Sequence, residues 1–290
     1  MKSTSKGKVN LSQLSMEKRF ECYHFIIFNL KSGHHHSKYV LKVFSPEASH
    51  YKYTHELYLR ESRLSKITHP NLLKILDTHP YIDSYIDQAQ REVDCLLIEK
   101  AAYGDFFTLL TREKLPKDEK LIRTFFHHLI EGISALHEHG LAHLDLRLEN
   151  LFLGDQFLLK IGNFQFCESV SDAHIVDTNQ FETKAPELDS KIINDKRKAD
   201  IYSAGVILFI LKTRTFPYMV SQTLQNSDEF WSDRCKVIGE SPAFTELILG
   251  MLEHNPDERY SIKEIKESEW YNGPCYDQSQ IEELLKSSLL

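Results

Sequence analysis

The residue pattern of the chain changes near residue 101, and this change restricts its fold more than any other feature. Before that point, β-branched and aromatic residues gather in short runs typical of β-strands, at 23–28, 38–44 and 93–100. One run there, 54–67, has helical spacing, and a polar stretch, 77–92, precedes the last strand. After residue 101, long runs have apolar residues at helical spacing: 119–140, 198–212 and two within 241–271. Strands first and helices afterwards favour an α+β fold in two lobes.

Composition excludes several classes of function. The net charge of −7 argues against a nucleic-acid partner, and the basic run 195–200 is interpreted as a solvated loop. No apolar run approaches a membrane span, and residues 1–10 lack the apolar core of a secretory signal. The five cysteines are scattered and never spaced as C-x-x-C, which suits free thiols in a reducing compartment. We therefore expect a cytoplasmic, intracellular protein that binds neither membrane nor nucleic acid.

Three polar side chains lie where two such lobes would face each other. Lys42 is embedded in the apolar run 38–44, and Asp145 and Asn150 lie in a short loop after the helix at 119–140. Together, a carboxylate, a carboxamide and a lysine could orient a hydroxyl, hold a cation and neutralise phosphate charge. Taken alone, Lys42 would more often be an edge lysine that reaches water.

Six motifs, in order and at fitting spacings, resemble those of a eukaryotic-type protein kinase domain. "VLKVF" resembles V-A-I-K, "HLDLRLEN" resembles H-R-D-L-K-P-E-N, and "NFQ" stands where D-F-G should be. "KAPEL" supplies A-P-E, and "KADIYSAGVILFIL" contains Asp200, which would brace the catalytic loop. "NPDERYSIKEIKESEWYNG" is similar to the closing segment of calcium/calmodulin-type and SNF1-like serine/threonine kinases. The likeness extends from about Phe20 to Gly273.

The resemblance implies a bilobal protein kinase fold with a β-rich N-lobe containing one main helix and a mostly helical C-lobe. We expect the N-lobe and linker at 1–101, the C-lobe at 102–273 and a tail helix at 274–290. In that tail, Ser279 and Glu282 have the spacing of a capping box. Its apolar stripe is formed by Ile281, Leu284 and Leu285. The stripe either packs on the C-lobe or docks a partner or a groove of the protein itself.

Roles in phosphate transfer follow from the same resemblance. Asp145 would accept or orient the proton of the substrate hydroxyl. Arg147, in place of the usual lysine, would contact the γ-phosphate of ATP. Asn150 and Asn163 would be the ligands of Mg²⁺, and Glu149 should point away into the structure.

The nucleotide-binding residues are assigned in the same way. Lys42 would pair with the α- and β-phosphates of ATP, and Glu61 would support it from the helix. The linker would offer backbone groups of Glu99 and Ala101 to adenine, with Ile98 as the gatekeeper behind it. Glu187 and Arg259 would form a buried ion pair that supports the C-lobe.

Four departures from the family pattern bear on chemistry. The segment that should be G-x-G-x-x-G contains no glycine, so Met16, Lys18 and Arg19 would crowd the phosphates. Asn163 replaces an aspartate, which removes a negative charge from the best metal ligand. Leu144 replaces the arginine that reads activation-loop phosphate, so the usual phosphorylation switch is not expected. Apart from these departures, Gln180 and Thr183 of the activation loop stand where a threonine and a tyrosine usually shape the peptide-binding shelf.

The fourth departure concerns the partner of Lys42. Counting back from "HPN" places Arg60 where the helix glutamate should be, with Glu61 beside it and Glu56 about a turn earlier. The partner stays open among these positions.

Two functions remain in competition. The first is a serine/threonine-kinase-like protein that binds nucleotide with a degraded metal site and acts through protein contacts. The alternative is an active serine/threonine kinase that transfers the γ-phosphate of ATP to a protein substrate. The retained Lys42, Asp145 and Asn150 favour the second, and Asn163 with the missing glycines favours the first.

Overall fold

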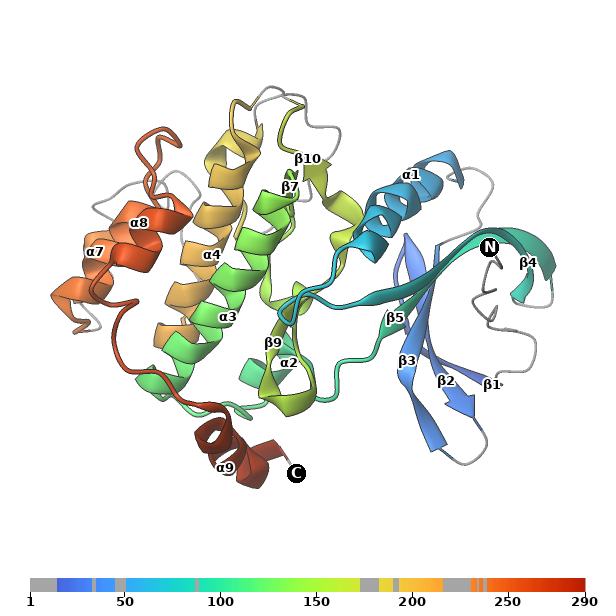
Figure 1. Cartoon of the computed structure of the whole chain (residues 1–290), viewed down its shortest axis with the longest axis horizontal. Coiled ribbons are helices and arrows are strands. Elements are labelled where there is room, and N and C mark those ends of the chain that lie inside the picture. Colours follow the sequence, from blue (N-terminus) through green and yellow to red (C-terminus); the bar gives the residue numbers. More distant parts are fainter. Residues whose placement is uncertain are drawn as a thin grey trace, which may run out of the picture. The chain divides into compact units, whose positions relative to one another are not determined.

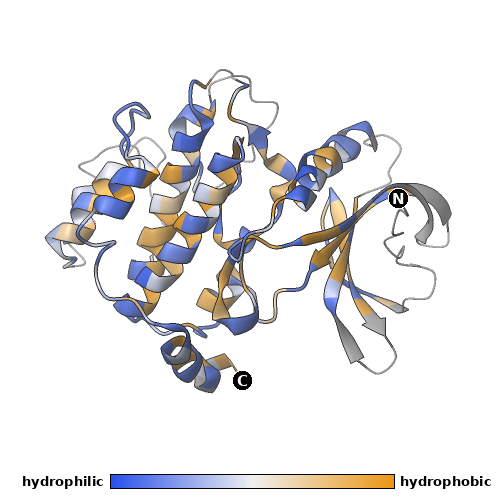
Figure 2. Cartoon of the chain, in the orientation of Figure 1, coloured by the Kyte–Doolittle hydropathy of each residue, from blue (hydrophilic) through white to orange (hydrophobic). Residues whose placement is uncertain are grey.

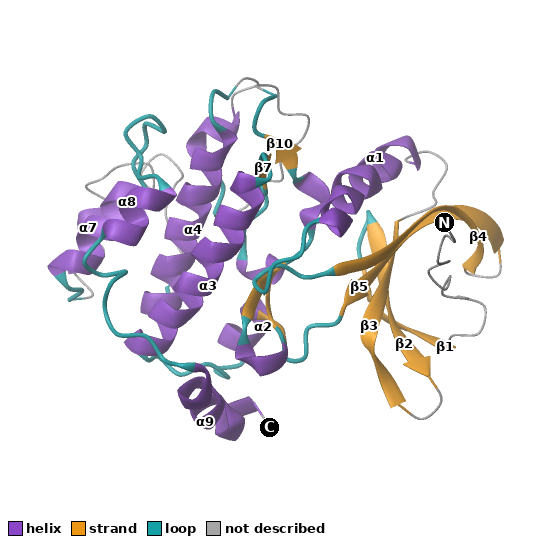
Figure 3. Cartoon of the chain, viewed as in Figure 1, coloured by secondary structure: helices purple, strands orange, loops and turns teal. Residues whose placement is uncertain are grey.

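A computed structural model describes residues 15–32, 35–44, 51–86, 89–172, 183–189, 193–215, 231–233, 235–236 and 239–289. The chain divides into two compact units, one of residues 1–66 and 74–100 and one of residues 67–73 and 101–290. Strands dominate the first unit and helices the second (Figure 3). The strand-first, helix-later order of the sequence is therefore present, but the short segment 67–73 belongs with the helical unit.

The first unit is a five-stranded antiparallel sheet with strand order β1-β2-β3-β5-β4 and one helix (Figure 1). Its elements are β1 (Ser15–Glu21), β2 (Phe25–Ser32), β3 (His35–Phe44), α1 (Tyr51–Ser62), the 3₁₀ turn η2 (Arg63–Lys66), β4 (Ile75–Ile86) and β5 (Ala89–Glu99). The polar stretch 77–92, expected to separate strands, lies within β4 and β5. That expectation was wrong because backbone pairing between the two strands continues through polar side chains, up to Ile86 opposite Ala89.

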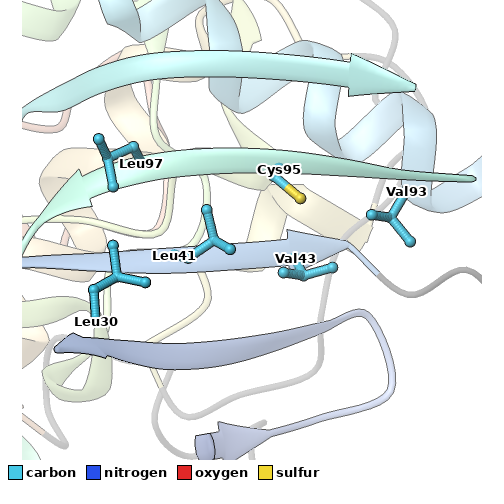
Figure 4. Close-up of a cluster of buried hydrophobic side chains, with 6 residues drawn as sticks. All are labelled: Leu30, Leu41, Val43, Val93, Cys95 and Leu97. Atoms are coloured by element: carbon cyan, nitrogen blue, oxygen red, sulfur yellow. The ribbon is translucent and has the colours of Figure 1, made fainter. Parts of the chain in front are cut away.

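Side chains of β3 alternate between the two faces of this sheet. Leu41 and Val43 join an apolar cluster on one face, completed by Leu30, Val93, Cys95 and Leu97 (Figure 4). Lys42 projects from the other face, which α1 covers through contacts described below. In the register of β2 with β3, Ile27 lies opposite Lys42 and Phe25 opposite Phe44. Phe25, Lys42 and Phe44 therefore share one face of the sheet.

The second unit is built on helices with short strands and turns between them. The helices are α2 (Phe106–Thr111), α3 (Glu119–Glu138), α4 (Lys196–Thr213), α7 (Pro242–Met251), α8 (Ile262–Glu267) and α9 (Gln278–Leu289). The strands are β6 (Gly104–Asp105), β7 (Leu141–Ala142), β8 (Leu151–Leu153), β9 (Leu159–Ile161) and β10 (Glu168–Ser169). The 3₁₀ turns are η3 (Leu148–Asn150), η4 (Asp155–Phe157), η5 (Phe164–Phe166) and η6 (Pro186–Asp189).

The two longest helices follow the sequence patterns closely. The Asp118 carboxylate caps α3 by accepting the Leu121 N–H, and the chain leaves the helix at Gly140, whose φ is +72°. Helix α4 is buried along most of its length, and Figure 2 shows its apolar middle following a hydrophilic first turn. The basic run 195–200 forms this first turn, so its interpretation as a solvated loop was wrong.

Short backbone ladders hold the loops that carry the candidate site. Strand β7 pairs with β10, and β8 pairs with β9, so the loop 143–150 and the loop after β9 each begin and end in paired backbone. The segment 67–73 adds a third support, because the Asn71 carbonyl accepts the Ile161 N–H at 2.8 Å and the Asn71 side chain donates to the Leu159 carbonyl at 2.9 Å.

The tail helix α9 begins with a capping box, but not the predicted one. Asp277 accepts the Gln280 N–H at 3.0 Å, and Gln280 accepts the Asp277 N–H at 3.1 Å. The predicted pair of Ser279 and Glu282 was wrong because the helix begins at Gln278, which makes Asp277 the capping residue.

Two of the three residues in the apolar stripe of α9 are covered by the protein itself, and the third, Leu284, is half-buried. Ile281 and Leu285 are buried, at 2% and 0% exposure. The helix lies against η4, where the Gln278 side chain donates to the Gln156 carbonyl at 2.7 Å. The structure therefore agrees with the interpretation that the stripe packs on the C-lobe.

Candidate functional site

The partner of Lys42 is Glu61, in the last turn of α1. The Lys42 Nζ lies 2.6 Å from the Glu61 Oε2, and the side chains are 0% and 1% exposed. Glu56 is exposed on the same helix. The count that pointed to Arg60 assumed no gap between "HPN" and the helix, and the pairing with Glu61 corresponds to a slip of one residue; α1 ends at Ser62 and a tighter 3₁₀ turn follows.

An aromatic side chain lies directly over this lysine. The Lys42 Nζ is 4.0 Å from the centre of the Phe25 ring and 5.3 Å from that of Phe44. Phe25 is the first residue of β2 and closes the turn after β1, where its carbonyl accepts the Cys22 N–H at 3.0 Å. This turn is where phosphate-binding glycines would lie. Sequence reasoning missed Phe25, although its position at the end of the glycine-free segment was visible.

The three bulky residues of the glycine-free segment are all in β1. Met16, Lys18 and Arg19 are in β1 and have exposed side chains. The alternation of a strand carries successive side chains to opposite faces, so a run of bulky residues does not all converge on one place. Residues 10–14 of the same segment lie outside the described residues.

The linker residues are held by β3 and β4 in the first unit. Ile98 is buried in β5 and pairs with Val40 and Ile75. The Glu99 N–H donates to the Lys74 carbonyl at 2.9 Å, and the Glu99 carboxylate accepts the Lys74 N–H at 3.2 Å. Ala101, also buried, begins the second unit. An adenine ring would thus have to use backbone groups other than the Glu99 N–H.

The loop 143–150 is held from α4 by Asp200, as its motif predicts. One carboxylate oxygen of Asp200 accepts the His143 N–H at 2.8 Å, and the other accepts the Leu144 N–H at 2.9 Å. His137 contributes a third bond to Asp200 at 2.8 Å. Leu144 has a φ of +62°, a region costly for a branched side chain, and it is buried. A buried leucine here has no group with which to read a phosphate.

The three side chains expected to act on hydroxyl and metal bond to one another. The Asn163 amide donates to the Asn150 Oδ1 at 2.7 Å. The Asn150 amide donates to the Asp145 Oδ2 and to the Asp145 carbonyl, both at 2.7 Å. Asp145 and Asn150 are buried, and Asn163 is half-buried with a left-handed φ of +60° that asparagine tolerates. The amide hydrogens of Asn163 and Asn150 therefore lie between the side chains of Asp145, Asn150 and Asn163.

This donor set fits a divalent cation poorly. The Asn150 oxygen that would ligate a metal instead accepts an N–H from Asn163. Mg²⁺ is usually bound through carboxylates, and Asn163 supplies none. In the part of the chain that the structure describes, no group of three or more His, Cys, Asp or Glu side chains could hold a metal ion. The arrangement is that of a hydrogen-bonded loop.

Arg147 is engaged by a neighbour in the same loop. Its guanidinium forms two bonds to Glu149, at 2.9 and 2.5 Å. Burial alone would raise the pKa of the Glu149 carboxyl, but the bond and charge of Arg147 hold that pKa below its usual value. Glu149 was expected to point away into the structure, and this was wrong because the nearby cation attracts its carboxylate.

Comparison with known proteins decides the family. The family model described as "Protein kinase domain" matches residues 26–271. The chain belongs to the protein kinase family. The predicted resemblance and the bilobal α+β kinase fold are thereby confirmed.

Curated kinases resemble this chain over about three quarters of its length. The carbon catabolite-derepressing protein kinase of Candida tropicalis is 30% identical over 227 residues, covering 74% of this chain and 34% of the relative. CBL-interacting protein kinase 26 of Oryza sativa subsp. japonica is 30% identical over 212 residues, covering 71% and 41%. The SNF1-like protein kinase ssp2 of Schizosaccharomyces pombe is 26% identical over 229 residues, covering 75% and 37%.

These matches place the chain among serine/threonine-kinase-like proteins, with SNF1-like relatives as predicted. The chain spans only about a third to two fifths of the length of these relatives, at 34%, 41% and 37% respectively. In the described parts of this kinase, no helix is both long and apolar enough to cross a membrane.

The supporting frame of the kinase fold, meaning Asp200 and the pair of Glu187 with Arg259, keeps its buried contacts. Arg259 is fully buried and forms two bonds to Glu187, at 2.5 and 3.0 Å. The Thr183 hydroxyl donates to the Leu146 carbonyl at 2.6 Å and so holds the segment before η6 against the loop 143–150. Gln180, assigned with it to the peptide shelf, lies outside the described residues.

The sequence did not predict one further buried ion pair. Lys196 in the first turn of α4 lies 2.5 Å from Glu168 of β10, with side chains 1% and 8% exposed. A lysine at a helix N-terminus is disfavoured by the helix dipole, and the glutamate offsets that penalty. No spacing rule links residues 28 positions apart, so the sequence carries no signal for this pair.

Proposed function

We propose that this protein is a serine/threonine-kinase-like protein that binds nucleotide weakly, transfers phosphate poorly and acts mainly through contacts with other proteins. The observation that carries this proposal is the bond from Asn163 to Asn150 at 2.7 Å. It satisfies, with an amide hydrogen, an oxygen that a kinase would turn toward Mg²⁺. Removing one preorganised electrostatic group typically costs about 10²–10³ in rate. Here the missing charge would hold the metal itself, so we expect at least that loss.

The proposed ligands and partners follow from this assignment. ATP is the nucleotide, with Mg²⁺ contributing little, and the partner is a protein and not a nucleic acid or a membrane. The net charge of −7 supports the exclusion of nucleic acid. The five cysteines are free thiols, which supports an intracellular, cytoplasmic location.

A thermal melt tests the proposal. The wild-type protein is melted with ATP alone, with Mg·ATP and with Mn·ATP, beside the Asn163→Asp variant. The wild type should gain the same small stabilisation in all three conditions, and Asn163→Asp should gain more with metal. A ligand at 1,000 times its dissociation constant stabilises by about 4.1 kcal/mol. A wild-type gain of that size that requires Mg²⁺ would contradict the proposal.

The alternative, an active serine/threonine kinase, is favoured by one specific observation. Asp145 keeps the buried position and the Asn150 bonds that would orient it toward a hydroxyl. If transfer occurs, Asp145→Ala should abolish incorporation of radiolabelled phosphate into a protein substrate. Equal labelling by wild type and Asp145→Ala would identify the signal as a contaminating kinase.

A further inference from the structure

Three side chains of its own unit lie against the buried ammonium of Lys42. Glu61 bonds to the ammonium at 2.6 Å, and the Phe25 ring lies over it with its centre 4.0 Å from Nζ. Phe44 lies on the same side at 5.3 Å. Lys42 is 0% exposed, and Phe25 is 6% exposed. The cation is therefore satisfied by a carboxylate and by aromatic faces, without any contribution from a nucleotide.

The position of Phe25 is fixed by strand pairing. Phe25 lies opposite Phe44 in the ladder of β2 and β3, two residues from the pair of Ile27 with Lys42. Diagonal neighbours on one face of a sheet lie within reach of aromatic and long side chains. The ring also packs against Phe20 and Phe44, with centroid distances of 6.0 and 6.5 Å. The Phe25 ring therefore occupies one direction from which a phosphate oxygen could approach the Lys42 ammonium.

We propose that Phe25 is a specificity-determining residue that closes Lys42 to phosphate, so that the site takes the nucleoside part of a nucleotide and gains little from its phosphates. This inference rests on the proposed nucleotide binding and deepens it. A glycine at this place would leave the ammonium open to phosphate oxygens, which bind it through charge-assisted hydrogen bonds. The aromatic ring instead holds the cation by attraction to its face, and it excludes both phosphate and water.

The first test compares adenosine, ADP and ATP by calorimetry in EDTA. In wild type, the three dissociation constants should agree within about threefold, because no phosphate reaches Lys42. In Phe25→Ala, ATP should bind at least about tenfold more tightly than adenosine, and adding Lys42→Met should remove this preference. Phe107→Ala is the matched control, because Phe107 is 37% exposed, belongs to α2 of the other unit and should leave the three constants unchanged. A tenfold wild-type preference for ATP that Lys42→Met removes would overturn the inference.

The second test does not depend on nucleotide binding. The folded wild type is treated with an acetylating N-hydroxysuccinimide ester, and modification of each lysine is followed by mass spectrometry. Lys263, whose side chain is 82% exposed, serves as the internal reference. Lys42 should react at least about 100-fold more slowly than Lys263, and Phe25→Ala or Phe25→Val should raise its rate at least about tenfold.

The two tests separate the two proposals. If wild type binds neither adenosine nor ATP, the proposed nucleotide binding fails, and the labelling of Lys42 alone decides the role of Phe25. A wild-type Lys42 that reacts as fast as Lys263 overturns that role. A slow Lys42 whose rate does not change in either folded Phe25 variant overturns it as well.

Discussion

The groups that support the kinase fold and the groups that would meet ATP differ in how closely they follow the family pattern. Asp200 and the pair of Glu187 with Arg259 keep the buried contacts that the family motifs predict. The groups assigned to phosphate and metal instead find partners within the chain: Lys42 under Phe25, Asn163 on Asn150, and Arg147 on Glu149. The contacts of the first set therefore carry no information about phosphate transfer.

Within the second set, the internal contacts differ in strength. The side chains of Arg147 and Glu149 are 31% and 39% exposed, and pairs of this kind contribute at most about 1 kcal/mol. A ligand could displace such a pair at little cost. Lys42 and Glu61 are fully buried, so displacing Phe25 from them requires rearrangement of packed side chains. We therefore expect the lysine, more than the arginine, to limit phosphate binding.

The largest expected effect is on the supporting frame. Arg259→Ala removes one partner of a buried ion pair and leaves the Glu187 carboxylate without its cation, so it should lower the free energy of unfolding by about 3–5 kcal/mol. Arg197→Ala is the matched control, because Arg197 is 51% exposed in its pair with Asp195 and should change stability by at most about 1 kcal/mol. Urea unfolding followed by circular dichroism measures both. Equal effects of the two substitutions would remove the distinction between frame and surface.

The buried pair of Lys196 and Glu168 provides a second test of the difference between buried and exposed contacts. Lys196→Met should lower the free energy of unfolding by about 3 kcal/mol, because it leaves the Glu168 carboxylate buried without its cation. The double variant Lys196→Met/Glu168→Leu should recover most of that loss, since apolar residues of similar size can replace a buried ion pair. The same unfolding measurement applies. A double variant that is less stable than Lys196→Met would show that the charges themselves are needed.

The sequence predicted the frame better than the site, for a physical reason. Helix α3 and its end at Gly140 follow from local periodicity and a left-handed glycine, and the partnership of Glu187 with Arg259 follows from the family motif. Phe25 over Lys42 and Lys196 on Glu168 depend on strand register and on tertiary packing. Neither leaves a local pattern, so only the three-dimensional structure brings them together.

The capping box of the tail helix likewise could not be predicted from a local pattern alone. Both Ser279 with Glu282 and Asp277 with Gln280 have the required spacing, and the choice depends on where the helix begins. The polar stretch 77–92 is a further case, because β-pairing with a partner strand outweighed its composition.

A somewhat smaller effect is expected in the tail helix. Leu285 is 0% exposed, and Leu285→Ala should lower the free energy of unfolding by about 2–3 kcal/mol through lost burial and the cavity left behind. Glu283→Ala, on the exposed side of α9, is the control and should change stability by about 0.5 kcal/mol or less. If Leu285→Ala leaves stability unchanged but removes a binding protein in pull-down, the tail belongs to a docking surface and not to the frame.

The smallest change in stability, and the most informative one for the site, concerns Asn163. Without metal, Asn163→Asp should cost about 1 kcal/mol, because the amide bond to Asn150 is lost and two acceptor oxygens face each other. Asn163→Ala separates the two causes, since it loses the bond without adding a charge. Chemical unfolding in EDTA measures both variants. An Asn163→Asp protein that is more stable than wild type in EDTA would show that the amide contact contributes nothing.

Direct measurement of metal binding tests the central claim. Mn²⁺ is titrated, in the presence of ADP, into wild type and Asn163→Asp, and the free ion is followed by electron paramagnetic resonance. We expect wild type to bind no more Mn²⁺ than ADP binds by itself, and Asn163→Asp to bind additional ion that disappears in Asn163→Ala. Mn²⁺ binding by wild type as tight as that of Asn163→Asp would contradict the account, because the amide of Asn163 would then not have taken the place of a metal ligand.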